Sequence, residues 1–147
     1  MKYLNVTPNL LATKIYRLSN YFSRRNYIFF ALIFQRLNLM LNGTEIHHAA
    51  QIGSNFMLIH SSGVIIGKNV IIGKNVKIYS SVVLGVKIPG IGEQPIIGDN
   101  VVLSTGAKIL GRIRIGDNCV VGANAVVLKD VPKGYTAVGV PSKNYLK

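Results

Sequence analysis

The sequence is poor in cysteine and in acidic residues, and each shortage excludes a class of protein. Cys119 is the only cysteine among 147 residues, so the chain can form no internal disulfide and no four-cysteine metal site. A single thiol is typical of a protein in a reducing compartment, and we therefore expect a cytoplasmic location. Five acidic residues against 17 lysines and arginines leave a net charge of +12. This surplus would attract phosphate-bearing ligands or an anionic membrane surface.

Three further classes of protein are disfavoured by missing patterns. The basic residues are scattered between apolar ones, without a helix-turn-helix, zinc-finger or RNA-binding signature, so we predict no nucleic-acid partner. The N-terminus lacks the order of charged, apolar and small residues that marks a secretory signal. The most apolar stretch, residues 27–41, is interrupted by Gln35 and Arg36 and is too short to span a bilayer.

A repeat of six residues runs through most of the chain. From Ile66 the blocks read IGKNVI, IGKNVK and IYSSVV, and the pattern resumes at Ile97 with IGDNVV. The first position of each block is Ile, Leu or Val, at Ile66, Ile72, Ile78, Ile97, Leu103, Ile109, Ile115, Val121 and Val127. The fifth is small or β-branched, at Val70, Val76, Val82, Val101, Ala107, Ile113, Cys119, Ala125 and Val131. The same frame extends upstream through Ile46, Ala50, Ile52, Phe56, Leu58 and Ser62.

This period predicts short strands joined by tight corners. Side chains on a strand alternate in direction, so two inward positions per block fit one strand and one corner. Gly67 and Asn69, with their equivalents in later blocks, are suited to left-handed corner conformations. Three blocks, about eighteen residues, would make one triangular coil, and stacked coils would enclose an apolar interior. We therefore predict an all-β parallel β-helix, in which Cys119 serves packing.

Residues 8–42 differ from the repeat. Apolar residues recur there at helical spacing (Leu10, Leu11, Ile15, Leu18 and Phe22), and a second helical run begins at Tyr27. We interpret residues 1–44 as an N-terminal α-helical cap on a β-helix domain of residues 45–147. The same residues also fit an alternative, peripheral membrane association through residues 8–42 at the inner face of the membrane.

The repeat is broken twice, and such departures are where function is expected. The block at Leu58 should be followed by one at Val64, yet the register restarts at Ile66, so two extra residues follow His60. After Leu84 the pattern resumes only at Ile97, which predicts a protruding loop at about residues 85–96.

His60 at the first break is our candidate general base. Glu45 lies fifteen residues upstream, nearly one coil away, and coils are ~4.8 Å apart, so its carboxylate could orient the imidazole. His47 and His48 could complete a three-histidine metal site with His60. Neighbouring residues on a strand point to opposite faces, however, so we predict no metal.

Several motifs together resemble the hexapeptide-repeat acyltransferases, in particular their serine-acetyltransferase-like branch. The resemblance covers about residues 45–143 and rests on EIHHAAQIG, LIHSSGVIIG, VVLG, GAKILG, VGANAVVLKDVP and AVGVPSK. It implies a left-handed β-helix, a homotrimer, and acetyl-CoA as co-substrate. It also implies that His60 is the general base and Glu45 its partner. The resemblance places acetyl-CoA along the backbone of Gly85, Thr105 and Ala123, and charge suggests phosphate contacts at Lys108, Lys129 and Lys143.

Departures from the family pattern bear on the acceptor. Serine enzymes of this family resemble one another in an Asp before the catalytic His and an Arg-His pair in the loop. Here those positions hold Ile59, Glu93 and Gln94. Because Glu93 would repel the carboxylate of serine, we expect a sugar hydroxyl of a surface or capsular polysaccharide unit as the acceptor. Transfer would be direct, since no Ser or Cys has the context of a covalent nucleophile. Two alternatives stay open: a serine O-acetyltransferase and a non-catalytic β-helix scaffold.

Overall fold

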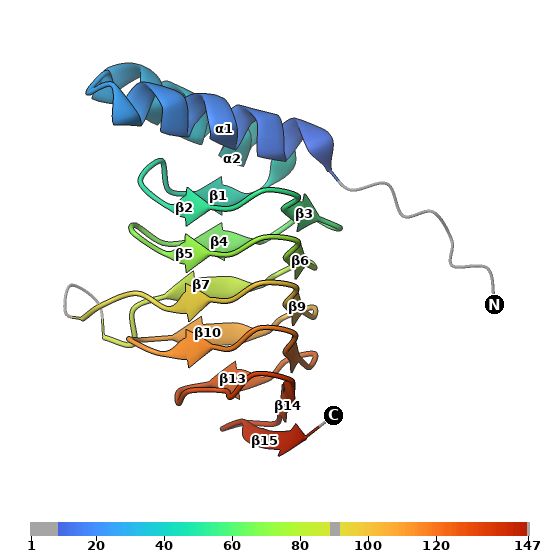
Figure 1. The fold of residues 1–147 in the computed structure, drawn as a ribbon. Coiled ribbons are helices and arrows are strands. Elements are labelled where there is room, and N and C mark those ends of the chain that lie inside the picture. Colours follow the sequence, from blue (N-terminus) through green and yellow to red (C-terminus); the bar gives the residue numbers. More distant parts are fainter. Residues whose placement is uncertain (1–8, 89–91, 147) are drawn as a thin grey trace.

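The computed structural model describes residues 9–88 and 92–146, which form two helices followed by a coiled stack of short strands. The helices α1 (Leu10–Arg24) and α2 (Ile28–Asn42) lie side by side across one end of the stack (Figure 1). Asn9 caps the start of α1, where its side chain accepts a hydrogen bond from the backbone N–H of Ala12. Gly43 ends α2 in a left-handed conformation. Neither helix of the described chain is both long and apolar enough to cross a bilayer.

The strands form three sheets that the chain visits in turn. The first sheet contains β1 (Glu45–Ile46), β4 (Ile65–Ile66), β7 (Val83–Gly85), β10 (Lys108–Leu110) and β13 (Val126–Val127). The second contains β2 (Gln51–Ile52), β5 (Ile71–Ile72), β8 (Ile96–Ile97) and β11 (Arg114–Ile115). The third contains β3 (Met57–Leu58), β6 (Lys77–Ile78), β9 (Val102–Leu103), β12 (Val120–Val121), β14 (Tyr135–Val138) and β15 (Lys143–Leu146). All described pairs are parallel except β14 with β15, so the predicted parallel β-helix is confirmed.

The core is made of the two inward positions that the repeat predicts. From Ile66 to Val131 every residue named above for the first and fifth positions is buried, Cys119 among them. In each sheet these side chains stack from coil to coil, for example Ile52 on Ile72 and Ile72 on Ile97. Ser62 is the exception, because it is exposed and Val64 occupies the inward position in its place.

The corners use asparagine and glycine for different reasons. Asparagines such as Asn75 adopt the left-handed conformation, with φ of 56°, as predicted. The glycine two residues earlier in the block does not, and Gly73 instead permits a close approach between coils. A Cβ added to Gly73 would lie 2.7 Å from the carbonyl oxygen of Gly98 in the next coil. The glycine requirement at this corner is therefore steric and not conformational.

Candidate active site

The first register break displaces His60 from the regular coil. The N–H of Ile59 still donates to the carbonyl of Ile78 at 2.8 Å, as a regular ladder residue does. The corner stack is rejoined at Ser62, whose carbonyl accepts the N–H of Ser81 at 2.9 Å. The two additional residues are therefore His60 and Ser61 themselves, and not the two that follow His60. This insertion leaves the imidazole exposed and moves Ser62 out of the core position expected for it.

His60 lies on one edge of the prism, where the chain passes from the third sheet to the first. We call this the His60 edge, formed by residues 59–64, 79–82, 104–107 and 122–125. Backbone hydrogen bonds join these corners, including the N–H of Asn124 to the carbonyl of Thr105 at 2.9 Å. Thr105 and Ala123 thus share an edge with His60, two and three coils further along. The Lys108 ammonium also reaches this edge, donating to the carbonyl of Gly106 at 3.2 Å.

The immediate neighbours of His60 differ from those expected. Glu45 begins β1 beside Ile65, and no hydrogen bond or ion pair joins its carboxylate to His60 within the described residues. Tyr79, one coil further on, lies edge-on to the imidazole with ring centroids 6.1 Å apart. Sequence reasoning passed over Tyr79, although it is the residue that follows the strand in the coil stacked on His60. The Glu45–His60 pair stays a prediction.

Gly85 and Lys129 lie at the opposite edge of the first sheet. Gly85 ends β7, and an added Cβ there would meet no atom within 4 Å. Its carbonyl accepts a hydrogen bond from the N–H of Gly111 at 2.8 Å, so the backbone of Gly85 is held in the sheet. The space that a side chain would occupy at Gly85 is open. The structure therefore places the predicted base on one edge and this predicted thioester contact on the other. Lys143, on β15, lies towards the His60 edge, since its neighbour Ser142 bonds to the carbonyl of Val126 at 2.9 Å.

The loop before β8 carries an ion pair that sequence reasoning did not foresee. The Nε of Arg112 donates to a Glu93 oxygen at 2.8 Å, with both side chains largely exposed. The adjacent Gln94 turns inward, and its Oε1 is buried without a hydrogen-bond partner in the described structure. Residues 89–91 of the predicted loop lie outside the described residues. The signal that could have revealed this pair is the opposite charge of Arg112 at the same edge of the next coil.

His47 and His48 lie at a corner, so the strand alternation used to separate them does not apply. Their rings are 4.3 Å apart, and the Nδ1 of His48 is 2.7 Å from the Ser23 hydroxyl of the cap. Burial, followed by the charges of His48 and Lys68, lowers the pKa of His47 from 6.5 to about 4. Burial and Lys68 also lower the pKa of His48. No group of three potential metal ligands lies together in residues 9–88 and 92–146.

We expect the protein to lose stability as the pH falls from about 6.5 to about 4. In this range the unfolded chain protonates His47 while the folded chain keeps it neutral, so protons favour unfolding. The loss should be on the order of 1 kcal/mol, since His47 is partly open to solvent. Urea unfolding across this range would measure it. His47→Asn, which keeps an acceptor for the N–H of Ala49, should flatten the slope, and an unchanged slope would contradict this origin.

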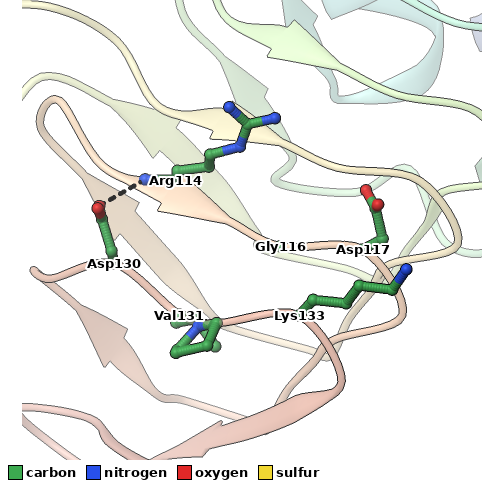
Figure 2. A pocket seen from close by; sticks show the side chains of 7 residues that line it. Arg114, Gly116, Asp117, Asp130, Val131 and Lys133 are labelled. Carbon is green, nitrogen blue, oxygen red and sulfur yellow. Dashed lines mark hydrogen bonds between the residues drawn. The ribbon is translucent and has the colours of Figure 1, made fainter.

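A pocket between the last coils lies elsewhere and is balanced in charge. Figure 2 shows it lined by two basic side chains, Arg114 and Lys133, and by two acidic ones, Asp117 and Asp130. One Asp130 oxygen already accepts the backbone N–H of Arg114 at 2.8 Å. Two carboxylates beside two cations do not favour an anion, so this hollow is a weaker candidate for phosphate binding than the His60 edge.

Comparisons with known proteins agree with this architecture. Residues 94–129 match the family model "Bacterial transferase hexapeptide (six repeats)" and residues 63–88 match "Hexapeptide repeat of succinyl-transferase". A serine acetyltransferase of Helicobacter pylori strain J99 is 41% identical over 141 residues, covering 95% of this chain and 82% of the relative. That of Bacillus pumilus is 40% identical over 133 residues, covering 87% of this chain and 59% of the relative.

Solved structures give the same result. A serine acetyltransferase in complex with CoA matches with a TM-score of 0.87 and 35% identity, over 91% of this chain and 55% of that one. The soybean serine acetyltransferase apoenzyme matches with a TM-score of 0.88 and 38% identity, over 92% and 56%. The chain thus spans a little over half of these solved proteins. With the hexapeptide matches, they confirm the predicted left-handed parallel β-helix.

Proposed function

The chain belongs to the serine acetyltransferase branch of the hexapeptide-repeat acyltransferases, and from this premise we propose that it transfers an acetyl group from acetyl-CoA to the hydroxyl of serine. The single observation that carries the proposal is the likeness to serine acetyltransferases over nearly the whole chain, cap included. The predicted acyltransferase class is confirmed by these relatives. A cytoplasmic location stays a prediction.

The expectation of a sugar acceptor is wrong. It is overturned by the relatives and solved structures named above, which are serine acetyltransferases and not polysaccharide-modifying enzymes. It depended on Ile59 in place of an Asp, on the loss of the Arg-His pair at Glu93 and Gln94, and on treating Glu93 as an unpaired negative charge facing the carboxylate of serine. In the structure Arg112 pairs with Glu93, which weakens the repulsion that argued against serine.

Arg112 also offers a positive charge to the carboxylate of serine. Its Nε bonds to Glu93, and the described residues provide no hydrogen-bond partner for its two Nη groups. The side chain is 78% exposed and stands beside the protruding loop. A guanidinium oriented by one carboxylate can bind a second one through its remaining N–H groups. We assign Arg112 to the recognition of the acceptor.

The proposed chemistry is direct transfer. His60 takes the proton of the serine hydroxyl as the oxygen forms a bond to the thioester carbonyl carbon of acetyl-CoA. Backbone N–H groups near Gly85 would stabilise the oxyanion of the tetrahedral intermediate. When the carbon–sulfur bond breaks, the imidazolium returns the proton to the CoA sulfur. Thr105, Ala123, Lys108 and Lys143 on the His60 edge, with Lys129, would line the path of the CoA arm.

A trimer would bring the two halves of this site together. His60 and Gly85 lie at opposite edges of the first sheet, so one chain does not join the base to the thioester contact. In a closed ring of copies, the His60 edge of one subunit can face the Gly85 edge and loop of the next. We therefore propose that the active site is shared between neighbouring subunits of a homotrimer.

The test is acetyl transfer by the purified protein, followed by CoA release and by mass spectrometry of the product. We expect O-acetylserine from free serine, and little product from N-acetylserine or serine methyl ester, which lack the ammonium or the carboxylate. Arg112→Gln should raise the KM for serine about tenfold, the usual cost of one charged hydrogen bond. Arg114→Gln, two residues further along the same coil, is the matched control and should leave KM unchanged.

Two outcomes would contradict the proposal. Equal turnover of serine and its methyl ester would show that the acceptor carboxylate is not recognised. CoA binding without transfer to serine would exclude serine as the acceptor while leaving the family assignment intact.

A further inference from the structure

Helix α2 turns polar side chains towards the protein and apolar side chains outward, which is the reverse of an ordinary surface helix. The side chains buried against the rest of the protein are those of Ala31, Gln35 and Asn38. The opposite face is apolar and open, with exposed fractions of 71% for Phe29 and 82% for Met40. A surface helix normally turns its apolar stripe inward and its polar residues outward. This arrangement therefore leaves the apolar face of α2 without a partner in the described chain.

The buried polar side chains show that the inversion is specific. Asn38 donates to the carbonyl of Ala12 at 3.1 Å, and the Oε1 of Gln35 accepts the backbone N–H of His48 at 3.1 Å. These bonds tie α2 to α1 and to the first coil. Rotating the helix to turn its apolar face inward would break both hydrogen bonds. The outward apolar face is consequently a fixed feature of the cap.

Helix α1 also exposes apolar side chains. Leu11 and Leu18 of that helix are also exposed, whereas its buried face consists of Ala12, Ile15, Tyr16 and Ser19. On α2 an apolar groove is lined by Phe29, Leu32, Ile33, Arg36, Leu37 and Met40. We call these exposed apolar side chains of both helices the cap face. An exposed apolar groove of this kind marks an interaction surface.

The positive charge of the cap indicates what kind of surface can cover the cap face. No acidic residue precedes Glu45 in the sequence, so the cap carries positive charge alone. Arg17 donates hydrogen bonds to the carbonyls of Ile52 and Gly53. Arg24 and Arg36 are exposed, and Arg36 also lines the groove. A surface that covers the cap face must therefore be both apolar and anionic.

We propose that the cap face docks on the surface of an anionic lipid bilayer. Apolar side chains flanked by arginines are the pattern of a helix that lies in the membrane interface. Each helix has 15 residues, which suits lying in the interface and not crossing it. A second copy of the cap is disfavoured because stacking two such faces would bring only positive charges together. The coils extend away from the cap in Figure 1, so docking leaves the His60 edge open to substrates.

The test is co-sedimentation of the full-length protein with vesicles. We expect binding to vesicles that contain phosphatidylglycerol, weak binding to pure phosphatidylcholine, and loss of binding at high salt. Arg24→Ala with Arg36→Ala should weaken binding about 25-fold, near fivefold for each cation. Phe29→Ser with Met40→Ser should abolish it while leaving acetyl transfer in solution unchanged. The matched control is Lys74→Ala with Lys77→Ala, which removes two charges from the β-helix and should have no effect.

Circular dichroism and thermal unfolding establish that each variant is folded. Equal binding of the cap and control charge variants would overturn the proposal, as would an absence of binding to anionic vesicles. An assembly larger than a trimer in sedimentation velocity, dissolved by the Phe29 and Met40 changes, would assign the cap face to a second copy instead. None of these outcomes depends on whether serine is the acceptor.

Discussion

Replacing His60 with alanine is expected to lower kcat for acetyl transfer by about 100- to 10,000-fold, the range typical of a general base. The hydroxyl of serine must lose a proton as it attacks the thioester, and without the imidazole only water can accept it. The effect should appear in kcat more than in the KM for acetyl-CoA, because the proposed donor contacts are made by other residues. Steady-state CoA release with serine as acceptor measures both parameters.

The folding of this variant should be unaffected, which separates catalysis from structure. His60 is exposed and makes no hydrogen bond in the described structure, and its only neighbour of note is the ring of Tyr79. The control is His47→Asn, a histidine of the same coil at the opposite edge of the first sheet, which should keep its activity near pH 7. Full activity in His60→Ala would remove His60 from the mechanism.

Replacing Ile72 with alanine is expected to cost about 2–5 kcal/mol of unfolding free energy. Ile72 is 2% exposed and stacks between Ile52 and Ile97 in the second sheet. In a prism of stacked layers each inward side chain has two such neighbours. The cavity left by truncation cannot collapse without shifting both coils. Urea unfolding followed by circular dichroism would measure the loss.

Ile71 provides a control within the same strand. It is the same residue type but points outward and is 39% exposed, so Ile71→Ala should change the unfolding free energy by no more than about 0.5 kcal/mol. A comparable loss for both substitutions would show that the outward face is also buried, which in this fold would mean a contact between subunits.

The sequence predicted the scaffold because a repeat of six residues states which side chains point inward. Ile66 and its equivalents are buried as expected, since a coil built of six-residue blocks turns the first position of each block inward. It also located both register breaks, one at His60 and one before Ile97, because an interruption is visible against a regular pattern. Family motifs then identified the branch, but the acceptor was misjudged from the departures at Ile59, Glu93 and Gln94.

The tertiary structure decided what a linear pattern cannot contain. The pairing of Arg112 with Glu93 joins two coils, and so does the contact of Tyr79 with His60, and neither is written in the spacing of one block. The inversion of α2 depends on the hydrogen bonds of Gln35 and Asn38 to other elements, which outweigh the apolar pattern of the helix itself. Local periodicity thus determined the fold of this protein. Contacts between coils, and between the cap and the first coil, determined which charges and apolar surfaces are left for its substrates and partners.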